Sequence, residues 1–154
     1  NLSFRTLGGY VITPTRSQLK AGLPWDQLVE VVRSNWMEYE VHYLGEGAPS
    51  SDAFLHEAIY VRRPEVGAVF HGHDGVILSQ AAALAREFDL AVTPTARAFG
   101  TREDAEETAR DLGGKGIIIR TGHGFVSVGR TPDEAGELAL RVHRRAIALS
   151  STGT

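Results

Sequence analysis

The chain has 154 residues and a mass of 16.7 kDa, the length of one domain with a full hydrophobic core. It is 42% hydrophobic and 23% charged with a net charge of -3, and no basic stripe with interleaved aromatic residues suggests a nucleic-acid partner. The absence of cysteine excludes disulfides, thiolate metal sites and cysteine nucleophiles. No long apolar stretch or signal peptide occurs, so we expect a cytoplasmic protein without a membrane partner.

Short strands are predicted in the first part of the chain, at residues 2–5, 9–13, 28–32 and 38–43. The first two are joined through Gly8 and Gly9, which is a hairpin signal. The sequence starts abruptly in strand-like residues. We therefore expect a single domain over residues 1–154 that lacks some residues before Asn1.

Helices and buried strands alternate in the rest of the chain. Capping side chains at residues 50–52 begin a helix that ends before Pro64, and an apolar run at residues 66–70 predicts a buried strand. One alanine-rich helix is predicted at residues 75–87, and Thr101 begins another that ends at Gly113.

The last third of the chain predicts two more buried strands, at residues 117–119 and 125–128, and a final helix from Pro132. The buried stripe of that helix is expected to consist of Ala135, Leu138, Ala139, Val142, Ala146 and Leu149. The whole pattern predicts an α/β domain in which helices cover a β-sheet.

Three of the six histidines follow predicted core strands. His71 and His73 are two residues apart at the end of one strand, where their side chains share a face and can converge on a metal ion. His123 lies between two glycines after another strand, and three histidines are the ligand set of a catalytic metal site with an open position. Alternatively, the first two face solvent and His123 is only a turn residue.

The residues that begin the helix near residue 52 also have two interpretations. Asp52 is either an acid/base or metal-binding group or a plain helix cap. Ser50 and Ser51 lie where free N–H groups and the helix dipole favour a phosphate. His56, one turn further on, is interpreted as a packing or supporting residue. His42 and His143 are assigned to structural or solvent-facing roles.

Taken in order, these motifs resemble the class II aldolase/adducin family over nearly the whole chain. The matching segments are Asn1-Leu2-Ser3-Phe4-Arg5, Ile12-Thr13-Pro14-Thr15, Pro49-Ser50-Ser51-Asp52 with His56 and Tyr60, Arg63-Pro64-Glu65 through His71-Gly72-His73, Phe99-Gly100-Thr101-Arg102-Glu103, and Gly122-His123-Gly124. The resemblance implies a three-layer domain, a central β-sheet flanked by helices. It also implies a homotetramer with active sites between subunits.

The resemblance further implies a metal-dependent aldolase that cleaves a small phosphorylated keto-sugar through a metal-stabilised enediolate. In such enzymes zinc is held by the residues matching His71, His73 and His123, although manganese, cobalt or iron suits the same ligands. Asp52 matches the acid/base carboxylate, and the phosphate is held by the residues matching Asn1, Thr15, Ser50 and Ser51.

The sequence departs from the family pattern at two places that bear on catalysis. Arg16 replaces a glycine and either contacts a phosphate or carboxylate of the substrate or blocks the pocket. The segment at residues 87–98 is short, and no tyrosine follows Tyr60 to match the family's catalytic one. An epimerase, a dehydratase or a decarboxylase on the same site therefore stays possible, as does a non-catalytic adducin-like binding module.

Overall fold

The computed structural model describes residues 1–15 and 22–151. Its strands form one mixed sheet in the order β4-β3-β2-β1-β5-β8-β7-β6. Neighbouring strands run antiparallel, except that β6 is parallel to β7. The strands are β1 (Leu2–Arg5), β2 (Tyr10–Ile12), β3 (Val29–Asn35), β4 (Glu40–Leu44), β5 (Ala68–Gly72), β6 (Ala91–Val92), β7 (Ile117–Arg120) and β8 (Gly124–Gly129).

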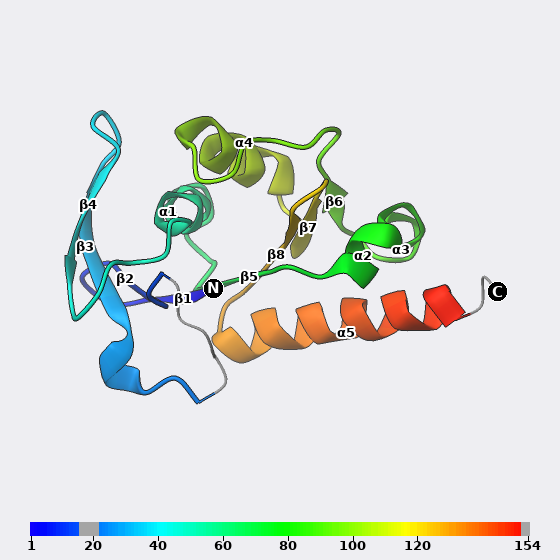
Figure 1. The fold of residues 1–154 in the computed structure, drawn as a ribbon, viewed down its shortest axis with the longest axis horizontal. Coiled ribbons are helices and arrows are strands. Elements are labelled where there is room, and N and C mark those ends of the chain that lie inside the picture. Colours follow the sequence, from blue (N-terminus) through cyan, green and yellow to red (C-terminus); the bar gives the residue numbers. More distant parts are fainter. Residues whose placement is uncertain (16–21, 152–154) are drawn as a thin grey trace.

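Helices cover both faces of this sheet, which confirms the expected three-layer α/β architecture (Figure 1). Helices α1 (Ala53–Arg62) and α4 (Arg102–Leu112) pack on one face. The other face carries α2 (Gly75–Ser79), α3 (Ala81–Glu87) and the long α5 (Pro132–Ser151). A short 3-10 helix, η1 (Trp25–Gln27), precedes β3. None of the helices in the described ranges is long and apolar enough to cross a membrane.

The prediction of one helix over residues 75–87 is wrong, because the chain turns at Gln80 between α2 and α3. The backbone of Gln80 leaves the helical region (φ -106°, ψ 11°), and its N–H donates back to carbonyl groups of α2. The turn lets Ile77 and Leu84 bury fully in one cluster beneath α5. The alanine-rich sequence carries no glycine or proline signal for this break.

Strand ends also differ from the prediction, because partner strands determine them. Strand β5 starts two residues later than expected and includes His71 and Gly72, which pair with β8. Strand β3 continues to Asn35, where it pairs with the first residue of β4. The two-residue strand β6 was not predicted, since it is too short for any periodic pattern.

The sheet register brings the predicted site segments to one end of β5, β8 and β7. Gly72 pairs with Phe125 on one side of β8, and Arg120 pairs with Gly124 on the other side. His73 and the turn that carries His123 therefore leave the sheet next to each other. Val69 and Val126 pack in the cluster beneath α1 and α4, and His71 follows Val69 by two residues on that face.

Candidate functional site

Three histidine side chains converge at this end of the sheet. The candidate ligand nitrogens of His71, His73 and His123 all lie within 4.8 Å of one another. The Nε2 atoms of His71 and His73 are 3.0 Å apart, and the rings of His71 and His123 stack with centroids 5.1 Å apart. Zinc binds histidine nitrogens at about 2.0–2.1 Å, and three histidines clustered in this way offer a ligand set for one divalent ion.

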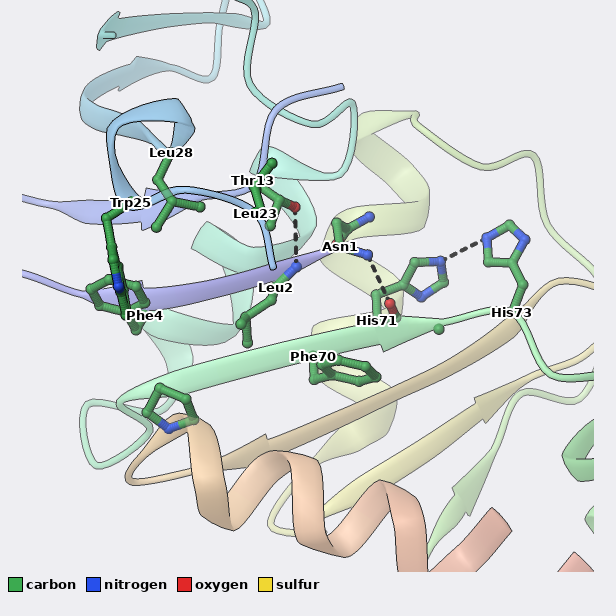
Figure 2. A pocket seen from close by; sticks show the side chains of 12 residues that line it. Asn1, Leu2, Phe4, Thr13, Leu23, Trp25, Leu28, Phe70, His71 and His73 are labelled. Atoms are coloured by element: carbon green, nitrogen blue, oxygen red, sulfur yellow. Dashed lines mark hydrogen bonds between the residues drawn. The ribbon is translucent and has the colours of Figure 1, made fainter. Parts of the chain in front are cut away.

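The ring of His71 is oriented by its neighbours. Its Nδ1 lies 2.9 Å from the carbonyl oxygen of Phe125 in β8. A carbonyl oxygen only accepts, so Nδ1 carries the proton and the lone pair of Nε2 faces the other histidines. On the backbone, the nitrogen of Asn1 donates to the His71 carbonyl (2.9 Å), as Figure 2 shows. The His71 N–H donates to the Asn1 carbonyl in return (2.8 Å).

The electrostatic environment keeps two of the histidines neutral. Burial lowers the pKa of His71 well below its ordinary value, although the Asp52 carboxylate opposes this effect. Burial also lowers the pKa of His123, helped by the positive charge of Arg120 and by His73. A neutral imidazole is the form that binds a metal ion, so these residues are ready ligands near neutral pH.

Asp52 immediately precedes α1, but its side chain makes no capping hydrogen bond to the helix. Instead, its Oδ2 accepts a hydrogen bond from Asn1 Nδ2 (2.7 Å) and lies 3.7 Å from His71 Nε2. Burial alone would raise the pKa of Asp52, but the Asn1 hydrogen bond and the positive charge of Arg120 hold it below the usual range. The geometry therefore places an ionised carboxylate beside the histidines and disfavours the plain helix-cap interpretation.

A cavity of about 360 Å³ opens over these groups. Thr15 reaches it because the bridge between Pro14 and Pro49 ties the end of the first hairpin to the segment before α1. Ser50 is buried and its Oγ accepts from the Asp52 N–H (3.3 Å), whereas Ser51 is exposed. The lining residues are Asn1, Pro14, Thr15, Ser50, Ser51, Asp52, His73, Phe99, Gly122 and His123.

The structure thus brings together the site residues predicted from the sequence, with one exception. Asn1, Thr15, Ser50, Ser51, Asp52, His73 and His123 all line the cavity, and His71 contacts Asp52 and His73 at its edge. Arg16 lies outside the described residues. His56 is buried and hydrogen-bonded to Ser3 (2.6 Å), the surroundings of a packing residue.

A second, larger cavity of about 780 Å³ lies beside the histidines (Figure 2). Its walls are mainly apolar and come from β1, β5 and the segment around η1. They include Leu2, Phe4, Leu23, Trp25, Leu28 and Phe70. It shares Asn1 and His73 with the smaller cavity, but no carboxylate is among the described residues that line it. Of these two cavities, only the smaller one has a carboxylate among the described residues that line it.

Sequence reasoning missed three residues near this centre. Phe99 is 67% exposed, lines the smaller cavity, and places its ring 5.0 Å from that of His123. Arg120 and Asp104 form a buried ion pair just behind the turn of His123. The sequence signal for Arg120 is a charged residue that directly follows Ile117-Ile118-Ile119 in a buried strand.

Comparisons with known proteins agree with one another on the family. Residues 1–148 match the family model described as Class II Aldolase and Adducin N-terminal domain. The chain is 29% identical to the 5-methylthioribulose-1-phosphate/5-deoxyribulose-1-phosphate aldolase of Rhodospirillum rubrum, over 95% of this chain and 68% of that protein. It is 28% identical to the L-fuculose phosphate aldolase of Haemophilus influenzae, over 99% of this chain and 74% of that protein.

A solved structure agrees with these relatives. The crystal structure of L-fuculose-1-phosphate aldolase from Thermus thermophilus superposes with a TM-score of 0.75 at 26% sequence identity. The similarity covers 98% of this chain and 81% of that one.

Proposed function

The chain belongs to the class II aldolase and adducin family, and from this premise we propose that it is a divalent-metal-dependent aldolase acting on a small phosphorylated keto-sugar. The observation that carries the proposal is the single cavity in which histidine nitrogens, one carboxylate and several hydroxyl groups meet. A metal-free binding module of the same fold has no need for three converging histidines, two of which are kept neutral.

His71, His73 and His123 are the proposed metal ligands, and zinc is the first choice among zinc, manganese, cobalt and iron. When bound, the ion supplies Lewis-acid stabilisation of the negative charge that develops on the substrate's carbonyl oxygen. The protein fixes two of the ligands through its backbone. His71 is held by the Phe125 carbonyl, and the N–H of His123 donates to the carbonyl of Arg120 (3.0 Å).

Asp52 is the proposed proton-transfer group. Cleavage breaks one carbon–carbon bond, and the electron pair stays with the fragment that carries the carbonyl group. The hydroxyl group on the other fragment loses its proton and becomes an aldehyde, and the first fragment then needs a proton on carbon. Asp52 is the carboxylate among the described residues of the cavity wall, and the hydrogen bond from Asn1 holds it beside His71.

The substrate phosphate is proposed to bind at the N-terminal end of α1. Ser50, Ser51 and Thr15 offer hydroxyl groups there and Asn1 an amide, and the helix end adds N–H groups and a favourable dipole. The Rhodospirillum rubrum and Thermus thermophilus relatives are named for ketose 1-phosphates. Replacing Ser50 and Ser51 together by alanine should raise KM for a phosphorylated substrate more than it lowers kcat, whereas an unchanged KM would place the phosphate elsewhere.

The proposed assembly is a homotetramer with active sites at subunit boundaries. The segment at residues 87–98 is short for the family, and no tyrosine is among the described residues that line the cavity. A neighbouring subunit is the proposed source of the remaining wall and of the second proton-transfer group. Light scattering that showed a fully active monomer would overturn this part of the proposal.

Product analysis tests the function. Protein loaded with zinc, manganese, cobalt or iron is incubated with ketose 1-phosphates, including 5-deoxyribulose 1-phosphate and L-fuculose 1-phosphate, and the released aldehyde is trapped and quantified. We expect aldehyde and dihydroxyacetone phosphate in equal amounts from the parent, and none from a His73→Gln variant. An epimeric sugar phosphate, loss of water or release of carbon dioxide would instead identify an epimerase, a dehydratase or a decarboxylase. No turnover together with no bound metal would identify a binding module.

A further inference from the structure

Arg120 is a charged residue that is buried at the end of an apolar strand. It ends β7 after three buried isoleucines, and its exposed fraction is 3%. Its Nη2 donates to Asp104 of α4, which is also 3% exposed, and Thr108 donates to the other carboxylate oxygen of Asp104 (3.3 Å). Such a buried ion pair adds little or nothing to stability relative to well-packed apolar residues of similar size. Stability alone therefore does not explain why Arg120 and Asp104 are buried as an ion pair.

The position of the pair beside His123 supplies that reason. The N–H of His123 donates to the carbonyl of Arg120 (3.0 Å), closing a turn in which Gly122 has a positive φ of 73°. Arg120 and His123 also line one small hollow of about 10 Å³. The carbonyl of Arg120 thus holds the turn, and Arg120 shares this hollow with His123.

The adjoining loop is anchored to the same helix. Arg97 pairs with Glu107 (2.7 Å) and Asp111 (2.6 Å) of α4, and it lines the same small hollow as Arg120. The Nη1 atoms of both arginines are buried without a hydrogen-bond partner among the described residues. Two segments that carry groups facing the cavity, Phe99 and His123, are therefore tied to one acidic side of α4 by arginines.

We propose that Arg120 is a positioning residue for the metal site: held by Asp104, it fixes the turn of residues 120–123 so that His123 faces His71 and His73. The inference rests on the proposed function, since it presupposes that these histidines bind a metal ion. Residues that orient a metal ligand typically change metal affinity by about 10–100-fold when they are replaced.

A double variant tests the inference. Arg120→Met with Asp104→Leu removes both charges and fills the space with apolar groups, so the fold should survive with a Tm close to that of the parent. We measure the zinc dissociation constant by chelator competition and the visible absorption spectrum of the cobalt-substituted protein. The proposal predicts about 10–100-fold weaker zinc binding and an altered cobalt spectrum. The control Arg145→Met, which breaks an exposed pair with Glu87 away from the cavity, should leave both unchanged.

Each outcome of this experiment supports or overturns the positioning role of Arg120. Parent-like zinc affinity and cobalt spectrum in the folded double variant would overturn the positioning role and leave the proposed function standing. A parent protein that binds no zinc or cobalt would overturn the proposed metal site and the inference with it. If the double variant does not fold, Arg120→Lys replaces it. This variant keeps a cation opposite Asp104 but loses the planar fork, so it should keep a near-parent Tm while zinc binding weakens several-fold, and unchanged binding would overturn the proposal.

Discussion

A substitution at Asp52 can distinguish a catalytic role of this side chain from a purely structural one. Its carboxylate turns away from the α1 N–H groups toward Asn1 and His71. The asparagine of an Asp52→Asn variant would still suit the start of a helix, and three histidines would remain for the metal. We expect this variant to retain its metal and Tm and to lose about 10²–10⁴-fold in kcat, the usual contribution of a positioned proton-transfer group. Unchanged turnover on the true substrate would show that Asp52 does not move the proton.

Glu57 on α1 provides a pH-dependent prediction away from the site. Burial raises its pKa above the ordinary value of 4.5, although the polar groups of Ser34 and Trp36 oppose this effect. As the pH rises above the ordinary value of 4.5, the unfolded chain loses the Glu57 proton before the folded chain does. Ionisation of Glu57 therefore lowers the free energy of unfolding as the pH rises through the raised pKa. This loss of stability persists at neutral pH.

The Glu57→Gln substitution should consequently raise the Tm by a few degrees at pH 7, and the gain should shrink at pH 4, where the native carboxyl holds its proton. Glu137→Gln, at an exposed position of α5, serves as the matched control and should change little at either pH. Thermal unfolding followed by circular dichroism at the two pH values checks this. A gain that is larger at pH 4 than at pH 7 would contradict the assigned direction.

Individual site residues were predictable where a residue type and its spacing carry chemistry. His71, His73 and Asp52 stood out because two histidines two residues apart at a strand end and an acid at a helix start can serve metal binding and proton transfer as well as structural roles. Arg120 did not stand out, because a charged residue after an apolar strand ordinarily marks the return of the chain to solvent. Only the partner Asp104, sixteen residues away, reveals that this arginine is buried.

At the level of elements, the first hairpin depends on one of its two glycines. A Cβ at Gly9 would lie 2.1 Å from the carbonyl oxygen of Val31 in β3, whereas a Cβ at Gly8 would meet nothing closer than 3.9 Å. Gly9→Ala should therefore lower the free energy of unfolding by about 1–3 kcal/mol or more. Gly8→Ala should change it by less than about 1 kcal/mol. Urea unfolding of both variants checks this, and equal effects would show that the turn rather than the contact with β3 requires glycine.

Elements with explicit end signals were predicted well. Helix α4 begins at Thr101, whose hydroxyl accepts from the Asp104 N–H (3.2 Å), and α5 begins with Pro132 at its first position. The break between α2 and α3 was not predictable, because burial of Ile77 and Leu84 beneath α5 decides it. Local sequence does not contain that information.

At the level of the whole molecule, the site exists only because distant segments meet. Asn1, Asp52, His71 and His123 come from four elements or turns, and antiparallel register brings them to one end of the sheet. Periodicity predicts the strands but not their order, so the residues alone suggested the three histidines as a ligand set without showing that they meet. The order of motifs shared with the family is what grouped them in advance.

Metal content per chain tests the central claim most directly. The parent and a His73→Gln, His123→Gln double variant are loaded with zinc, freed of excess ion by gel filtration, and analysed by elemental mass spectrometry. Both replaced side chains are partly or largely exposed, so the variant should keep the circular dichroism spectrum of the parent. We predict about one zinc ion per chain in the parent and nearly none in the folded double variant. A parent without zinc, or a variant that keeps its ion, would contradict the assignment of these histidines as a metal centre.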